Sequence, residues 1–135
     1  MEPILKIWYE TMKNDRRILG LKCKRCGTVM FPPVPVCGAC SCMETEWVEM
    51  SGKGEMYALG YSPNGTPPYY DDPTVFCNAK LEEGMIFAAP LKGAKRKQIA
   101  ALEAQTPVPV HMEVQDLDDT VAYPRFVLDE EGQEA

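Results

Sequence analysis

Residues 23–40 read CKRCGTVMFPPVPVCGAC, and this stretch decides the fold. It holds two C-x2-C pairs, Cys23 with Cys26 and Cys37 with Cys40, separated by ten residues. Two residues between cysteines allow a tight turn that directs both sulfur atoms toward one centre. Two such turns facing each other place four thiolates at the corners of a tetrahedron, which is the closed geometry of structural zinc. The spacing therefore predicts one zinc ion held by these four cysteines.

Other uses of paired cysteines fit the surrounding sequence less well. Iron also accepts four thiolates and is kept as the alternative metal. A redox C-x2-C pair sits singly at a strand-to-helix junction of a βαβ unit, and no such pattern surrounds either pair. Structural disulfides belong to oxidising compartments, whereas charged residues from Glu2 onward interrupt any apolar secretory segment. No apolar run approaches the roughly 18–20 residues of a membrane span. We therefore expect a cytoplasmic protein that does not enter a membrane.

The remaining thiols and the one histidine do not combine into a catalytic pair. Four thiolate ligands leave zinc no open position for substrate or water, so the metal is expected to be structural. Cys42 follows the last ligand by two residues, and Cys77 lies in an apolar run typical of a small buried side chain. His111 falls in an alternating segment far along the chain from Cys77. We expect no catalytic residue here, and so no enzyme activity from this chain by itself.

The first predicted unit is an amphipathic helix within residues 1–16. Ile4, Trp8 and Met12 recur every four positions, as on one face of a helix. Trp8, Tyr9 and Met12 have the composition of an interface anchor, so they are predicted to contact a partner protein. The pattern equally allows this face to pack back on the chain itself.

The rest of the chain is predicted to form a zinc ribbon (17–50), a barrel (51–128) and a disordered acidic tail (129–135). Period-two alternation marks the barrel strands, and one helical segment interrupts them. In order, the three strands, the helix and the two last strands are predicted at 51–62, 73–81, 84–91, 95–105, 108–117 and 121–128. This is the order of elements in an OB-fold. The predicted fold class is mainly β: an N-terminal helix, a rubredoxin-like zinc ribbon and a five-stranded OB-fold barrel.

A zinc ribbon followed by an OB-fold is also a pattern of nucleic-acid-binding modules, and charge tests that alternative. The chain has 14 basic and 20 acidic residues, a net charge of −6. Residues 1–53 carry +2 and residues 54–135 carry −8. A barrel that binds nucleic acid needs a basic groove along the phosphates. The acidic barrel therefore argues against nucleic acid, which remains the alternative function.

Three motifs together resemble a known family. The motifs are L-x-C-x2-C-G-x3-F-P-P-x-P-x-C-x2-C, E-W-V-x2-S-G-x-G and a closing P-R-F. In this order they are similar to the small zinc-ribbon/OB-fold proteins associated with acyl-CoA metabolism, which accompany thiolase-fold enzymes. The resemblance covers almost the whole chain. It departs after the third and fourth cysteines, where the family often has proline and glycine and this chain has Gly38 and Ser41.

The resemblance implies a function. It predicts a non-catalytic accessory subunit of a hetero-oligomer, with the reacting groups supplied by a thiolase-fold catalytic subunit. The complex would carry out thiolytic cleavage or acyl transfer on an acyl-CoA. A substrate of the benzoylsuccinyl-CoA type is one candidate, although no residue singles out an acyl group.

One basic cluster suits CoA binding independently of the family resemblance. Lys92, Lys95, Arg96 and Lys97 lie at the start of the predicted second helix, within an otherwise acidic barrel. Ammonium and guanidinium groups beside a helix N-terminus suit the phosphates of CoA. A solvated charged turn is the alternative. The loop at 63–73 is long enough to be functional and is expected to lie near the same ligand.

Overall fold

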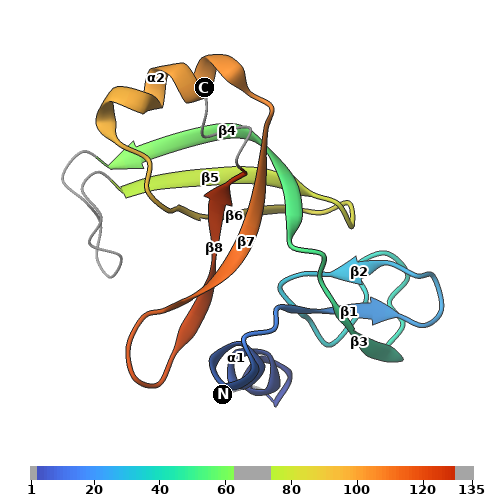
Figure 1. Cartoon of the computed structure of the whole chain (residues 1–135). Helices are drawn as coiled ribbons and strands as arrows, with labels where there is room; N and C mark the ends of the chain where they lie inside the picture. Colours follow the sequence, from blue (N-terminus) through green and yellow to red (C-terminus); the bar gives the residue numbers. More distant parts are fainter. Residues whose placement is uncertain (1–2, 63–73, 130–135) are drawn as a thin grey trace.

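The computed structural model describes residues 3–62 and 74–129 (Figure 1). Two helices and eight strands are assigned within these ranges. In chain order they are α1 (Pro3–Asp15), β1 (Leu19–Cys23), β2 (Val29–Met30), β3 (Thr45–Glu49), β4 (Lys53–Ser62), β5 (Thr74–Leu81), β6 (Ile86–Leu91), α2 (Arg96–Gln105), β7 (Val108–Asp116) and β8 (Ala122–Leu128).

The ribbon is a three-stranded antiparallel sheet in the order β2-β1-β3. The central strand pairs Leu21 with Met30 on one side and with Trp47 on the other. Its own buried cluster is small and consists of Leu21, Cys23, Met30 and Cys37. So few apolar side chains cannot hold a sheet of this size alone, which is why units this small usually depend on a metal or disulfide.

The second unit is a closed five-stranded barrel in the order β4-β5-β6-β8-β7. Neighbouring strands are antiparallel except β6 and β8, which meet in parallel at Leu91 and Phe126. Helix α2 connects β6 to β7, and Figure 1 shows it across the upper end of the barrel. This confirms the predicted fold class of N-terminal helix, ribbon and OB-type barrel.

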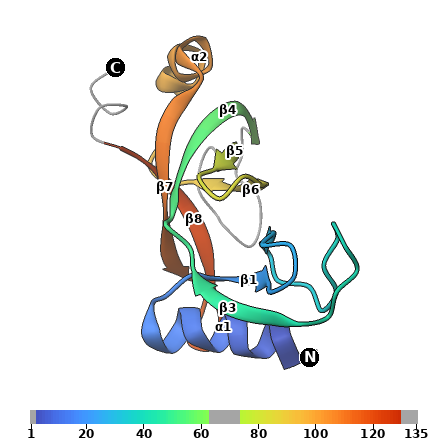
Figure 2. The ribbon, with the colours of Figure 1, turned by 90° about the vertical axis from the view of Figure 1, so that its right-hand side faces the viewer.

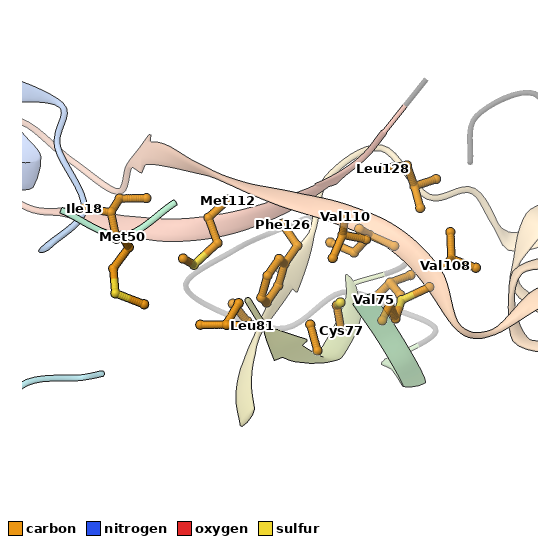
Figure 3. Close-up of a cluster of buried hydrophobic side chains, with 14 of the residues drawn as sticks. Ile18, Met50, Val75, Cys77, Leu81, Val108, Val110, Met112, Phe126 and Leu128 are labelled. Carbon is orange, nitrogen blue, oxygen red and sulfur yellow. The ribbon is translucent and has the colours of Figure 1, made fainter. Parts of the chain in front are cut away.

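Alternating side chains of the strands fill the barrel. On β5, Val75, Cys77, Ala79 and Leu81 are all buried and face inward, as the period of two predicts. Phe126 on β8 is fully buried. Figure 3 shows Val75, Cys77, Leu81 and Phe126 gathered between the strands. They lie with four side chains of β7 and β8, namely Val108, Val110, Met112 and Leu128.

The S-G-x-G motif at residues 51–54 connects the last strand of the ribbon to the first strand of the barrel. Gly52 has a φ of +79°, in the left-handed region that glycine adopts without a steric penalty. At Gly54, a Cβ atom would lie 2.8 Å from the carbonyl oxygen of Lys80 on the neighbouring strand. The two glycines therefore serve two purposes, a turn in the backbone and a close approach of β4 to β5.

Helix α1 packs on its own chain, which corrects the prediction that its aromatic face is open to a partner. Trp8 is 3 % exposed and Met12 is fully buried, both within the main core cluster. The indole Nε1–H of Trp8 donates to the carbonyl oxygen of Leu19 at 2.6 Å. Tyr9 is half-buried and packs at the edge of the same cluster. The sequence correctly predicts an apolar face on this helix, but the ribbon and the barrel of the same chain cover that face. In this structure Trp8 and Met12 are not accessible to another protein.

Ion pairs fix the C-terminal end of α1 to the turn between β7 and β8. Asp116 accepts from both guanidinium nitrogens of Arg16, at 2.8 and 2.7 Å, and from Lys13 at 2.9 Å. Lys13 also donates to the carbonyl oxygen of Asp118 at 2.9 Å. Hydrogen bonds from Arg16 and then from Lys13 hold the pKa of Asp116 well below its usual range. Since these groups are exposed, they orient the helix more than they stabilise it.

A chain of aromatic contacts joins the three parts of the molecule. Phe31, in the segment between the two cysteine pairs, packs edge-on against Trp8 of α1 with ring centroids 5.6 Å apart. Its other side meets Phe87 of β6 at 4.7 Å. Phe87 in turn lies 6.2 Å from Phe126 in the barrel. Such pairs add about 0.5–1.5 kcal/mol each beyond the area they bury.

Two predicted features lie outside the described residues. They are the loop at 63–73 and most of the acidic tail at 129–135, of which only Asp129 is described. Among the described residues, neither helix has the length and apolar character that crossing a membrane requires.

Replacing Phe31 with alanine should destabilise the whole chain. Phe31 is 6 % exposed, and truncation of a buried phenylalanine costs about 3–5 kcal/mol. Denaturant unfolding in the presence of zinc should show a loss in this range, with the near-UV signal of Trp8 altered in the folded state. Val34→Ala is the matched control from the same segment, since Val34 is 43 % exposed, and should change stability by less than about 0.5 kcal/mol. Equal stability of the two variants would contradict the packing described here.

Candidate metal centre

The four predicted ligands converge on one point. The sulfur atoms of Cys23, Cys26, Cys37 and Cys40 all lie within 4.8 Å of one another. Two cross-pair distances, Cys23 to Cys40 and Cys26 to Cys37, are both 3.6 Å between the sulfur atoms. Four thiolates around a tetrahedral zinc, each at about 2.3 Å, are separated by roughly 3.8 Å. The cluster is therefore close to the dimensions of a tetrahedral zinc site.

The two knuckles repeat one backbone pattern. In the first, the amide of Cys23 donates to the carbonyl of Thr28 at 2.8 Å, and the amide of Gly27 donates to the carbonyl of Cys23 at 2.9 Å. In the second, the amide of Cys37 donates to Cys42 and the amide of Ser41 donates to Cys37, both at 2.9 Å. The turns are thus superimposable in their hydrogen bonding, which is what a symmetric set of four ligands requires.

This repeat explains the departure noted at Ser41. Gly27 and Ser41 hold equivalent positions, with φ of +81° and +64°. The left-handed conformation suits glycine, and a serine there carries a steric cost. The turn is kept even though its preferred residue is missing, so the substitution leaves the position of the Cys40 sulfur intact.

Hydrogen bonds lower the pKa of ligand thiols. The hydroxyl and then the amide of Thr28 lower the pKa of Cys26 to about 6. Backbone amides, first that of Cys26, lower the pKa of Cys23. At Cys40 the amide of Cys42 acts in the same direction, but burial and the neighbouring sulfurs raise the pKa to about 12. In the bare cluster the Cys40 thiol thus retains a proton that a bound cation would displace.

The residues present fit a structural zinc ion. Four sulfur donors complete a tetrahedral shell, so no position remains for a substrate or for an activated water. The chemistry that zinc supplies here is folding free energy, about 10–16 kcal/mol of apparent binding in small zinc-dependent units. That amount is large compared with what the four-residue ribbon cluster can contribute.

The other thiols stand apart from this site. Cys42 corresponds to Thr28 in the repeat, and its sulfur accepts from the amide of Glu44 at 3.4 Å. Cys77 is fully buried in the barrel, where desolvation raises its pKa to about 12. The role of Cys42 was left open by the spacing. Aligning the two knuckles would have shown that Cys42 is not a ligand. The triplet C-G-T at 26–28 corresponds to C-S-C at 40–42, so Cys42 holds the position of Thr28.

His111 lies on the outer side of the barrel wall. Its neighbours Val110 and Met112 are buried and face inward, whereas His111 is half-exposed. Its Nδ1 lies 2.6 Å from an oxygen of Asp129, and its Nε2 lies 3.4 Å from an oxygen of Glu113. The barrel wall separates the histidine from the sulfur of Cys77. The two do not form a nucleophile–base pair.

The basic cluster is found where the sequence placed it. Lys92 is in the turn after β6, and Lys95, Arg96 and Lys97 begin α2, all with exposed side chains. Gln98 caps this end by accepting from the amide of Lys95 at 2.9 Å. In Figure 1 this end of α2 and the ribbon lie at opposite ends of the molecule. The structure therefore brings the four cations together but keeps them away from the metal centre.

The comparisons agree with this site. Residues 12–41 match the family model for the ChsH2 rubredoxin-like zinc ribbon domain. A DUF35 domain-containing scaffold protein of Methanocaldococcus jannaschii is 33 % identical over 83 residues, which are 60 % of this chain and 58 % of that protein. This chain is therefore similar to zinc-ribbon proteins of the DUF35 family, and its residues 12–41 match the ChsH2 type of ribbon.

Further relatives extend the match to the barrel. A probable enoyl-CoA hydratase alpha subunit of Thermomonospora curvata is 28 % identical over 119 residues, covering 88 % of this chain but 35 % of that protein. The chain thus spans about a third of the first of these two curated relatives and somewhat over half of the second. A solved structure, the Ltp2-ChsH2(DUF35) aldolase, shares the fold with a TM-score of 0.77 at 24 % identity, over 95 % of this chain and 96 % of that one. A DUF35 protein of Sulfolobus solfataricus has a TM-score of 0.61 at 13 % identity, over 96 % and 87 %.

Metal analysis of the purified chain should give about one zinc per molecule. Cys37→Ser should lose the metal and unfold the ribbon, because it removes a buried ligand. Cys42→Ser is the matched control from the same knuckle and should keep a full complement of zinc, since Cys42 corresponds to a non-ligand threonine. Full zinc retention after removal of both Cys37 and Cys40 would disprove the ligand set.

Proposed function

We propose that this chain is a non-catalytic accessory subunit of a cytoplasmic enzyme complex that acts on acyl-CoA. The observation that carries the proposal is a metal centre closed by four thiolates in a chain whose described residues hold no nucleophile–base pair. The zinc cannot take part in bond making, Cys77 is enclosed by the barrel, and His111 is engaged by carboxylates on the outside. The role that best suits such a chain is to position a catalytic subunit or its substrate.

The names of related proteins support this role. One relative is described as a scaffold protein, another as the alpha subunit of an enoyl-CoA hydratase, and the shared fold occurs in an aldolase that contains a ChsH2 DUF35 component. Each of these descriptions involves assembly or CoA chemistry. By analogy this chain would be one part of a hetero-oligomer rather than a complete enzyme.

We further propose that the catalytic partner has a thiolase fold. The complex would then perform thiolytic carbon–carbon cleavage or acyl transfer, and a benzoylsuccinyl-CoA type of substrate is compatible with it. The support is the combined motif of knuckles, F-P-P and S-G-x-G, which resembles the partners of thiolases. On this view the reacting cysteine and histidines belong to the partner, and this chain improves their alignment with substrate.

Copurification and reconstitution test the accessory role. The tagged chain, recovered from its native cell, should bring down an acyl-CoA enzyme that mass spectrometry identifies. The separately purified catalytic subunit should show a lower rate, a higher KM or a lower thermal midpoint than the reconstituted complex. If the catalytic subunit alone equals the complex in all three, the proposed role is wrong. Turnover of an acyl-CoA by this chain alone would likewise refute it.

The cations at the start of α2 are proposed to contact the nucleotide end of CoA at the subunit interface. Replacing Lys95, Arg96 and Lys97 with alanine should raise the KM of the complex for acyl-CoA, because phosphates lose charge-assisted hydrogen bonds of about 1.5–3 kcal/mol each. The value of kcat should change little. Lys53→Ala with Lys80→Ala is the control, since both are exposed barrel lysines outside the cluster at the start of α2. An unchanged KM in the triple variant would show that the cluster is only a solvated turn.

A further inference from the structure

The second knuckle exposes a set of apolar side chains. Val34, Val36 and Met43 are 43 %, 40 % and 72 % exposed, and together we call them the knuckle tip. The amide of Cys37 donates to the carbonyl of Cys42 at 2.9 Å. Because Val36 and Met43 flank the two ends of this bond, they are held side by side. The tip is therefore one surface made by two separate stretches of the ribbon.

The tip is held rigidly. Pro33 and Pro35 bracket Val34, which restricts the backbone on both sides of it. The ligand Cys37 follows Val36 directly, so the metal centre anchors the segment at that end. In Figure 2 the loop that leads into β3 projects at the edge of the molecule. A rigid apolar projection loses little entropy on binding, as in pre-organised interfaces.

Cations of the first knuckle border this tip. The amide of Lys24 donates to the carbonyl of Glu44 at 3.0 Å, which places the backbone of Lys24 beside the residue that follows Met43. Lys22, Lys24 and Arg25 are all exposed. Lys22 lies opposite Glu46 in the sheet and Glu44 directly follows Met43, so these carboxylates offset part of the positive charge. The ribbon thus presents an apolar centre with the exposed cations Lys24 and Arg25 on one side and Glu44 next to Met43.

We infer that the knuckle tip is the docking surface for the catalytic subunit. Lys24 and Arg25 favour a partner whose apolar hollow carries carboxylates on the side that faces the first knuckle. This inference rests on the proposed accessory role and names the surface that performs it. It replaces the N-terminal helix, whose Trp8 and Met12 are buried, as the main contact.

A protein fits this surface better than a nucleic acid does. Binding of single strands uses exposed aromatic rings for stacking, but Phe31 of the ribbon is buried and Trp47 is half-buried. Three cations also give few phosphate contacts. Val34, Val36 and Met43 would contribute nothing to either form of nucleic-acid recognition.

The experiment compares two charged double variants in binding to the purified catalytic subunit that copurifies with the wild-type chain. Val36→Asp with Met43→Asp should weaken binding tenfold or more, because carboxylates enter an apolar, acid-edged contact. Tyr57→Asp with Ile86→Asp is the control on the barrel, where these residues are 47 % and 62 % exposed, and should bind as the wild type does. Zinc content and thermal midpoint must be equal in all three proteins, so that loss of the ribbon is not mistaken for loss of docking.

Charge reversal gives a second, independent readout. Lys24→Glu with Arg25→Glu, checked for full zinc content, should slow association and flatten its dependence on salt. Unchanged binding of the tip variant, or equal weakening by the barrel variant, would overturn the docking proposal and leave the accessory role standing. Failure of the wild-type chain to bind any acyl-CoA enzyme would instead remove the accessory role itself. Loss of self-association, or of bound nucleic acid, as the only effect of the tip variant would also overturn the proposal.

Discussion

The edge-on packing of Phe31 between Trp8 and Phe87 is the contact on which the arrangement of this chain depends. Phe31 comes from the segment between the knuckles, Trp8 from the N-terminal helix and Phe87 from the barrel. Phe31 lies in the core cluster in which helix, ribbon and barrel bury apolar side chains together. The hydrogen bond from Trp8 to Leu19 fixes the position of the indole in this cluster. The metal site therefore has structural consequences beyond the ribbon.

Zinc and the aromatic core depend on each other. The segment that carries Phe31 runs from Cys26 to Cys37, so ligands hold both of its ends. Without the metal, this segment regains backbone entropy, at about 1–2 kcal/mol per residue released, and Phe31 loses its fixed position. Metal binding thus orders the surface on which α1 and the barrel meet. Ion pairs from Lys13 and Arg16 to Asp116 then set the angle of the helix from its other end.

Local chemistry explains which features the sequence predicted. The spacing of the cysteines specifies a tetrahedral cluster without reference to the rest of the chain, and alternation on β5 specifies an inward face. Tertiary partners are different. A period of four at Ile4, Trp8 and Met12 predicts a buried face but not what buries it, so a partner protein and the chain itself fitted equally well. The pairing of Arg16 with Asp116 spans 100 residues and leaves no pattern in either segment.

The buried helix changes how the accessory role must be understood. If α1 is part of the core, then recognition falls to other surfaces that the fold keeps exposed, among them the knuckles and the start of α2. They lie at opposite ends of the molecule, joined by the aromatic core and by a closed barrel without a free edge. A body of this kind can hold a partner at one end and a charged ligand at the other, at a fixed separation. Under the proposed accessory role, that fixed separation is the property through which the chain would influence a reaction.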